Sequence, residues 1–321
     1  MKTKTLSLIS IFPLLVSCSK TLKVSKIVFF FDTQIDIKVE DATHDTLGMI
    51  KGIFINLDEE TDNYQLRKEN YGVYSINQSH DEVWISENLY ELLDLSIKLK
   101  DNGAPNFNPF MGSLAKLWKE AIINKTVLSD DVITSELAKI NSTSLTLKQL
   151  DASNHSAQRV GDAEVDLGGI VKGYALDKVQ EYFKASNTSH YIVDAGNSSI
   201  LLGEKNSKDG LYSVGIGVDK AYLELKNCFV STSGIEHQSA EIGGVIYSHI
   251  INPTNGSATP LHDKVIVVSD KGYIGDAFST SMMNNTIEEI KQIETQYNVK
   301  TIVINDGKID YVNNGLEVKY H

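Results

Sequence analysis

The stretch 166–177 constrains this chain more than any other part of the sequence. It reads Asp-Leu-Gly-Gly-Ile-Val-Lys-Gly-Tyr-Ala-Leu-Asp, so a carboxylate and two glycines come directly before an expected helix whose first turns contain Lys172. The N-terminus of a helix has free N–H groups and a partial positive charge, and it therefore suits a phosphate group. A glycine-tightened turn with solvated charges would give the same short pattern. The pattern alone therefore does not distinguish a phosphate-binding helix start from an ordinary turn.

The composition is that of an ordinary globular protein. The chain has 321 residues, of which 41% are hydrophobic and 22% are charged, so it can bury a sizeable core without cross-links. The formal net charge of −12 argues against a nucleic-acid partner, which would need a basic surface. No internal repeat and no long linker divides the sequence, and we expect one domain.

The N-terminus predicts export and lipid attachment. Residues 1–17 carry two lysines followed by an apolar run that is too short to span a membrane, which is typical of a signal peptide. The segment ends Leu-Val-Ser-Cys and resembles a lipobox, so we expect Cys18 to be lipidated and to become the mature N-terminus. An ordinary signal sequence with an incidental cysteine is the alternative. We assign residues 18–26 to a tether and residues 27–321 to the domain.

This assignment predicts an extracytoplasmic protein anchored to the cell membrane by acyl chains. It would lie on the periplasmic side of an inner membrane or on the outer face of a plasma membrane. Once Cys18 is lipidated, Cys228 is the remaining cysteine, so an internal disulfide and a thiolate metal site are excluded. Cys228 lies next to Phe229 and Val230, and we expect it to be buried in a strand.

The order of elements predicts an α+β fold with mixed or antiparallel sheets and packed helices, because helices and strands come in blocks rather than in strict alternation. The weakly apolar stretch 124–159 suggests a surface excursion. We expect helices at 43–60, 87–100, after Pro109, after Ser129, and at 168–185, 274–283 and 287–297. We expect strands at 27–39, 191–193, 200–202, 212–218, 222–225, 245–247, 265–268, 301–304 and 309–312.

A second chemical motif is Gly-Asp-Ala-Phe-Ser-Thr at 275–280. Asp276 and Thr280 are four residues apart, so on a helix their side chains share one face. A carboxylate and a hydroxyl are hard oxygen donors of the kind that Mg²⁺ accepts. The alternative is a solvated aspartate in the first turn and a threonine bonded to its own helix.

Two further segments have residue types that suit a site. His249 ends a predicted strand before the turn Asn-Pro-Thr-Asn-Gly, where an imidazole could act as a general base near neutral pH. A structural histidine is the alternative. The segment 230–234, Val-Ser-Thr-Ser-Gly, could let a ligand approach the backbone or could form a plain turn. No His-Glu-x-x-His pattern occurs, which argues against a zinc hydrolase.

Together and in this order, the motifs resemble the FAD:protein FMN transferase family, the ApbE-type flavin transferases. The resemblance extends over residues 27–312 and includes an early Phe-Asp-Thr at 31–33 and the segment 104–118 leading to Leu-Trp. The sequence departs from the family pattern at Asn106 and Asn108, where Ala and Asp are usual. It departs again at 194–198, which lacks a second glycine, and at Gly275, where Ala is usual.

The resemblance implies a single T-fold-related domain that transfers FMN from FAD to a threonine hydroxyl of an acceptor protein and releases AMP. It implies Mg²⁺ bound by Asp276, Thr280 and the backbone carbonyl of Gly169. The resemblance also assigns the catalytic base to His249. By motif position, the residues implied to hold FAD are Phe31, Asp166, Lys172 and Ile250.

The implied acceptor is a membrane redox subunit or an extracytoplasmic flavoprotein, and the lipid anchor would hold the enzyme at the membrane. Three other functions stay open on the sequence. One is Mg²⁺-dependent hydrolysis of FAD to FMN and AMP, with water in place of the threonine. Another is a non-catalytic FAD-binding lipoprotein, and the last is a structural surface lipoprotein.

Overall fold

The computed structural model describes residues 22–102, 104, 106–151, 154–236 and 238–321. The predicted signal peptide and the predicted lipidation site Cys18 lie outside these residues. Among the described helices, none has the length and apolar character needed to cross a membrane.

Eight helices occur in the described part of the chain, and the periodic apolar segments of the sequence predict most of them to within a few residues. The short helix α2 is an addition to the expected set. The bounds are α1 (Thr46–Thr61), α2 (Gly72–Gln78), α3 (Glu87–Asp101), α4 (Gly112–Ile123), α5 (Asp130–Ser142), α6 (Val171–Ala185), α7 (Gly272–Met282) and α8 (Ile287–Tyr297).

The described strands form one large and three small antiparallel sheets. The large sheet has the order β1-β2-β6-β7-β10-β13-β14-β15, with β1 (Leu22–Phe30), β2 (Thr33–Ala42), β6 (Tyr191–Ala195), β7 (Ser199–Leu202), β10 (Cys228–Gly234), β13 (Lys264–Ser269), β14 (Lys300–Asn305) and β15 (Lys308–Val312). The small sheets are β16-β9-β8, β11-β12 and β3-β5-β4, with β3 (Val83–Ile85), β4 (Ser144–Gln149), β5 (His155–Val160), β8 (Tyr212–Gly215), β9 (Ala221–Leu225), β11 (Ser239–Ile242), β12 (Val245–Ser248) and β16 (Lys319–Tyr320).

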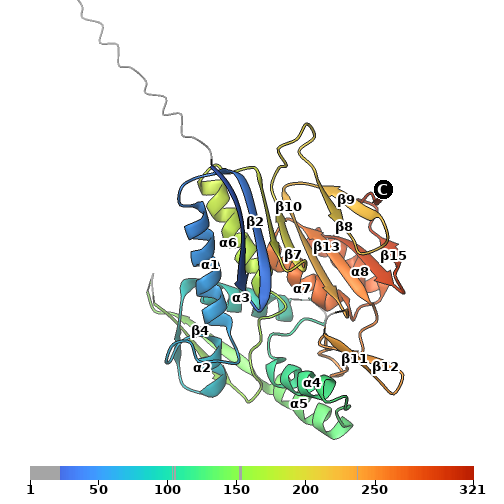
Figure 1. The fold of residues 1–321 in the computed structure, drawn as a ribbon. Helices are drawn as coiled ribbons and strands as arrows, with labels where there is room; N and C mark the ends of the chain where they lie inside the picture. The colour runs from blue at the N-terminus through green and yellow to red at the C-terminus, as the bar shows by residue number, and fades with distance from the viewer. Residues whose placement is uncertain (1–21, 103, 105, 152–153, 237) are drawn as a thin grey trace, which may run out of the picture.

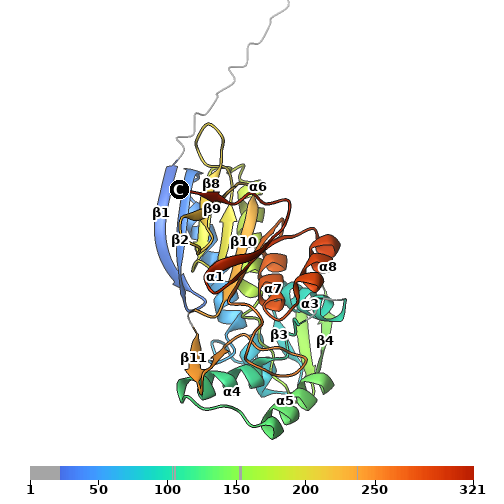
Figure 2. The ribbon, with the colours of Figure 1, turned by 90° about the vertical axis from the view of Figure 1, so that its right-hand side faces the viewer.

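The large sheet separates two hydrophobic clusters. Successive side chains of a strand point to opposite faces, so on β13 Val265 and Val267 pack toward the helices while Ile266 and Val268 pack toward the small sheet β16-β9-β8. Helices α1, α6 and α7 cover the first face (Figure 1). In both views α4, α5 and β11 lie below the large sheet (Figure 1, Figure 2). This arrangement confirms the predicted α+β class with antiparallel sheets and packed helices.

The structure corrects the predicted start of the domain. Strand β1 begins at Leu22 and pairs with β2 from that residue on, so residues 22–26 belong to the large sheet rather than to a tether. The polar residues Lys23, Ser25 and Lys26 make this segment look like a linker in the sequence. They are compatible with an edge strand because most of their side chains remain exposed.

Two further expectations change. Residues 230–234 supply five of the seven residues of β10, an inner strand bonded to β7 and β13, and do not form a plain turn. The stretch 124–159 is largely exposed, as expected for a surface excursion, but it is regular rather than irregular, because its described residues supply α5, β4 and most of β5. Arg159 on β5 is buried and donates to the carbonyls of Ile76 and Asn77, so hydrogen bonds replace the apolar contacts that the sequence lacks there. Cys228 is buried in β10 as predicted, and burial raises the pKa of its thiol to about 12.

Candidate functional site

The N-terminal turns of α6 and α7 touch each other through two glycines. A Cβ atom on Gly173 would lie 2.1 Å from the carbonyl oxygen of Gly272. A Cβ atom on Gly272 would lie 2.2 Å from the carbonyl oxygen of Gly173. No side chain fits at either position, so this close approach of two backbones requires glycine at both.

Each of these helices supplies a carboxylate to the N-terminus of the other. On α7, Asp276 Oδ2 accepts a hydrogen bond of 2.6 Å from the backbone N–H of Gly173. On α6, Asp177 accepts bonds of 2.8 Å from the N–H groups of Gly272 and Tyr273. The first N–H groups of a helix have no partner within the helix, and a carboxylate also interacts favourably with the helix dipole there. The two motifs of the sequence are thus joined by reciprocal caps.

Asp276 is oriented further by two serines of the large sheet. Ser199 on β7 and Ser231 on β10 are paired in register, and their hydroxyls donate to Asp276 Oδ1 over 2.7 and 2.8 Å. Full burial raises the pKa of the Asp276 carboxyl, against the lowering effects of Lys172 and of these hydrogen bonds. A carboxylate has about four acceptor positions, and three are used here, which leaves about one for a ligand.

A small polar pocket of about 30 Å³ adjoins Asp276 at the start of α6. Thr280 Oγ1 lies in it, 3.2 Å from Ser233 Oγ and beside Gly169. The lining is formed by glycine backbone, hydroxyl groups, one carboxylate and one ammonium group: Gly168, Gly169, Lys172, Ser198, Ser199, Thr232, Ser233, Asp276, Ser279 and Thr280.

The donors of this pocket fit Mg²⁺ better than a softer metal. In the described part of the chain, no three His, Cys, Asp or Glu side chains cluster where they could hold a metal ion. Mg²⁺ typically binds through one or two carboxylates, with water and phosphate oxygens completing its shell. Asp276, the Thr280 hydroxyl and the Gly169 backbone meet this requirement when a phosphate is present.

Asp166 lies directly before this pocket and is held by two donors. Its Oδ1 accepts from the N–H of Gly168 over 2.7 Å, and its Oδ2 accepts from Asn63 Nδ2 over 3.1 Å. Asn63 follows α1 and is buried. Asp166 therefore connects the end of α1 to the turn that precedes α6, with its carboxylate at the rim of the glycine segment.

The other three predicted residues do not line the small pocket. Phe31 has a positive φ of 52°, and its N–H donates to Asp58 Oδ1 over 2.6 Å on α1. Ile250 is buried after β12. His249 is exposed at the same strand end, and its Nδ1 lies 3.3 Å from the carbonyl oxygen of Gln238. The structure thus brings Gly169, Lys172, Asp276 and Thr280 together, with Asp166 next to them.

Sequence reasoning missed several residues that shape the site. Asp177 ends the glycine-containing run, but its spacing does not show that it caps a different helix. Ser199 and Ser231 carry a weak signal, since small hydroxyl residues beside glycines allow close packing. Only the pairing of β7 with β10 shows that the two hydroxyls converge on one carboxylate.

Comparison with known proteins identifies the family of this chain. The model of the ApbE family matches residues 31–303. The chain belongs to the ApbE family. It is 27% identical over 219 residues to the FAD:protein FMN transferase of Treponema pallidum, covering 62% of this chain and 60% of that protein. It is 24% identical over 249 residues to that of Chlamydia muridarum, covering 75% of this chain and 76% of that protein.

Solved structures of ApbE proteins share the fold. The ApbE protein of Thermotoga maritima superposes with a TM-score of 0.72 at 20% identity, over 93% of this chain and 97% of that chain. The flavin transferase ApbE from Vibrio cholerae superposes with a TM-score of 0.70 at 17% identity, over 92% of this chain and 98% of that chain. At these low identities the two structures show that the fold is shared, and they show nothing beyond the fold.

One departure from the family pattern has a packing reason. Gly275 lies on α7 where Ala is usual, and a Cβ there would lie 2.6 Å from Ser231 Oγ and 2.8 Å from Ser269 Oγ. We predict that Gly275→Ala lowers the free energy of unfolding by about 1–3 kcal/mol through overpacking. Adding Ser231→Ala should recover part of the lost free energy of unfolding, because it removes the oxygen nearest to the new methyl group. Urea denaturation of both single variants and the double variant measures this coupling.

Gly52→Ala is the matched control, since Gly52 lies inside α1 with no atom within 4 Å of its added Cβ. This variant should be neutral or more stable, because alanine favours a helix by about 1 kcal/mol over glycine. Equal effects of Gly52→Ala and Gly275→Ala would show that the packing around Ser231 is not tight.

Proposed function

We propose that this protein transfers FMN from FAD to a threonine hydroxyl of an acceptor protein and releases AMP. The observation that supports this most strongly is the convergence of both motifs on one oxygen-lined pocket at the N-terminus of α6. Membership of the ApbE family supports it independently, as do relatives named FAD:protein FMN transferase.

The reaction is a substitution at the phosphorus atom of the FMN half of FAD. A bond forms between the threonine oxygen and this phosphorus, and the bond from phosphorus to the bridging oxygen breaks, so AMP departs with that oxygen. His249 takes the proton of the threonine hydroxyl, which is a poor nucleophile without a base. The exposed position of His249 allows a protein substrate to approach it.

The remaining residues bind and orient the substrate. The ammonium group of Lys172 and the partial positive charge at the N-terminus of α6 attract the pyrophosphate. Asp166, Phe31 and Ile250 hold the rest of FAD. Asp276, Thr280 and the Gly169 carbonyl would hold Mg²⁺, which would neutralise charge on the pyrophosphate when bound.

We propose in addition that the enzyme is exported and anchored through Cys18 to the membrane. Its acceptor is then a membrane redox subunit or another extracytoplasmic flavoprotein. The support for this arrangement is the sequence Leu-Val-Ser-Cys at 15–18, which resembles a lipobox and follows a short apolar run.

The direct test is incubation of the protein with FAD, Mg²⁺ and a candidate acceptor. The acceptor should gain the mass of FMN at a threonine, and one AMP should appear for each modified acceptor. Mass spectrometry and nucleotide chromatography of the same sample measure both. AMP and free FMN in equal amounts without an acceptor would instead identify a pyrophosphatase, and bound FAD without turnover would identify a binding protein.

We predict that His249→Ala lowers the rate of flavin transfer by at least about 100-fold, the usual contribution of a general base. FAD affinity should change little, because the exposed imidazole does not line the pocket. Single-turnover transfer and FAD titration measure the two effects. His44→Ala alters another exposed histidine and is the control. Transfer at the parent rate in His249→Ala would remove His249 from this role.

We predict that Asp276→Ala weakens Mg²⁺ binding in the presence of FAD and abolishes stimulation by Mg²⁺. Asp276 also caps α6, so a second variant must separate the two roles. Asp177→Ala removes the reciprocal cap from α7 and should cost about 2 kcal/mol of stability. It should leave the Mg²⁺ affinity close to that of the parent. Calorimetric Mg²⁺ titration and urea denaturation of both variants provide the comparison.

Equal loss of Mg²⁺ affinity in Asp177→Ala and Asp276→Ala would contradict the metal assignment. Asp276 would then matter only because it holds the two helices together.

A further inference from the structure

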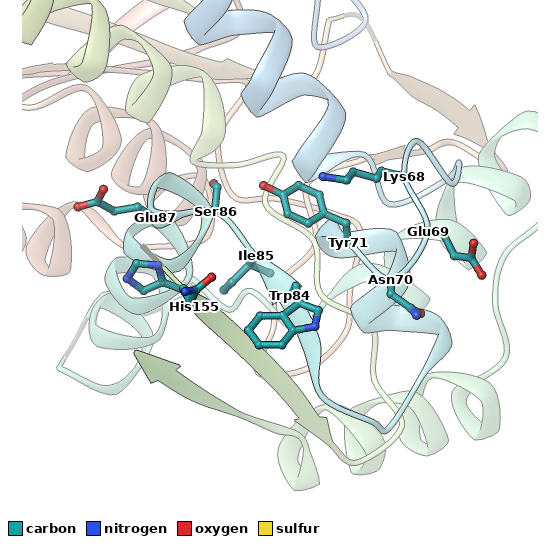
Figure 3. Close-up of a pocket in the computed structure, with 10 residues that line it drawn as sticks. Lys68, Glu69, Asn70, Tyr71, Trp84, Ile85, Ser86, Glu87 and His155 are labelled. Atoms are coloured by element: carbon teal, nitrogen blue, oxygen red, sulfur yellow. The ribbon is translucent and has the colours of Figure 1, made fainter. Parts of the chain in front are cut away.

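A second and larger cavity, of about 510 Å³, lies outside the small pocket (Figure 3). It is formed by the segment between α1 and α2, the junction of β3 with α3, and the start of β5. Its volume is typical of a binding site for a small molecule. None of the eight predicted site residues lines it. The lining consists of Lys68, Glu69, Asn70, Tyr71, Trp84, Ile85, Ser86, Glu87, Asn154 and His155.

Two walls of this cavity are fixed by one buried carboxylate. Glu60 accepts hydrogen bonds from the Tyr71 hydroxyl over 2.8 Å and from Ser86 Oγ over 2.5 Å. Ser86 Oγ also accepts from the N–H of Leu89 and so caps α3. The cavity is therefore preformed, which lowers the entropy lost when a ligand binds.

His155 gives the first indication of a ligand. Its side chain is 2% exposed, and its Nδ1 is buried with no hydrogen-bond partner among the described residues. The next residue on β5, Ser156, donates to Glu82, so the strand otherwise satisfies its buried polar groups. An unpaired buried nitrogen costs about 1–3 kcal/mol. Such a cost is understandable if a ligand supplies the missing partner.

The charges and the aromatic surface indicate which ligand. Trp84 is 51% exposed and lies between Glu87 and His155 on one side and Glu69 on the other (Figure 3). Within the described chain, neither glutamate has an ion pair or a side-chain hydrogen bond. The ammonium group of Lys68 is already placed over the Tyr71 ring, 4.3 Å from its centre.

We propose that this cavity binds a small organic cation of the guanidinium class. A flat guanidinium group stacks on the face of an indole and interacts with its electrons. Its N–H groups donate to the carboxylate of Glu87 and to His155 Nδ1, which lie on the same side of Trp84 (Figure 3). This site is distinct from the proposed flavin site and does not depend on the transferase activity.

The probe is agmatine, added to the full chain with Trp84 fluorescence as the readout. The chain has two tryptophans. Trp118 is buried, and its indole N–H donates to the Gly256 carbonyl, so a ligand in the cavity should change the fluorescence emission of Trp84 alone. We expect a saturable change with agmatine. Choline, which has no N–H donor, should bind at least about tenfold more weakly.

Two variants test the residues by calorimetry. Glu87→Gln should weaken agmatine binding about tenfold, whereas Glu288→Gln should not, although both glutamates lie in the first turn of a helix. His155→Leu should also weaken binding while leaving the unfolding free energy unchanged or higher, because it removes an unpaired nitrogen. A purely structural histidine would give a less stable variant with parent affinity.

The proposal fails if agmatine gives no saturable signal or if choline binds equally well. It also fails if Glu87→Gln and Glu288→Gln bind alike, or if His155→Leu keeps the parent affinity.

Discussion

Two helices that cap each other determine the geometry of this protein. Asp276 on α7 accepts from the backbone of α6, and Asp177 on α6 accepts from the backbone of α7. The exchange brings the two N-termini into contact and requires Gly173 and Gly272 at the crossing. Because both helices then direct their positive ends to one place, the junction is suited to an anion and to a metal that accompanies it.

The buried charge of Asp276 explains the surrounding hydroxyl groups. A carboxylate taken out of water is costly unless hydrogen bonds replace its solvation. Ser199 and Ser231 supply two of these bonds from neighbouring strands, and Gly173 supplies a third. These donors also restrict the carboxylate to one orientation. The same contacts therefore serve the stability of the core and the placement of the carboxylate that we propose as a metal ligand.

Much of this fold could be predicted from the sequence, for reasons that particular elements show. Helices α3 and α8 have regular apolar stripes, and their bounds agree with the expected ranges. The glycine-rich run before α6 does lie at a helix start, although the helix begins at Val171 rather than Gly168. Local patterns are sufficient in these cases because the signal lies within one turn or one helix.

The contacts that complete the site could not be predicted in this way. For residues 230–234 the sequence leaves open a segment that a ligand approaches and a plain turn, because serine and glycine weaken a strand pattern. The structure places them in β10, inside the sheet, with Ser231 and Ser233 directed toward α7. Asp177 and Gly272 are 95 positions apart in the sequence, so no local signal relates them. His155 is similar, since only the packing of β5 shows that its Nδ1 is buried without a partner among the residues that the structure describes.

The most direct measurement is anomalous diffraction from crystals of the protein grown with Mn²⁺ and FAD, with Mn²⁺ in place of Mg²⁺. The account predicts a manganese peak bonded to Asp276, Thr280 and the carbonyl oxygen of Gly169, with the FAD pyrophosphate at the start of α6. A manganese peak away from Asp276, or a pyrophosphate bound elsewhere, would contradict it.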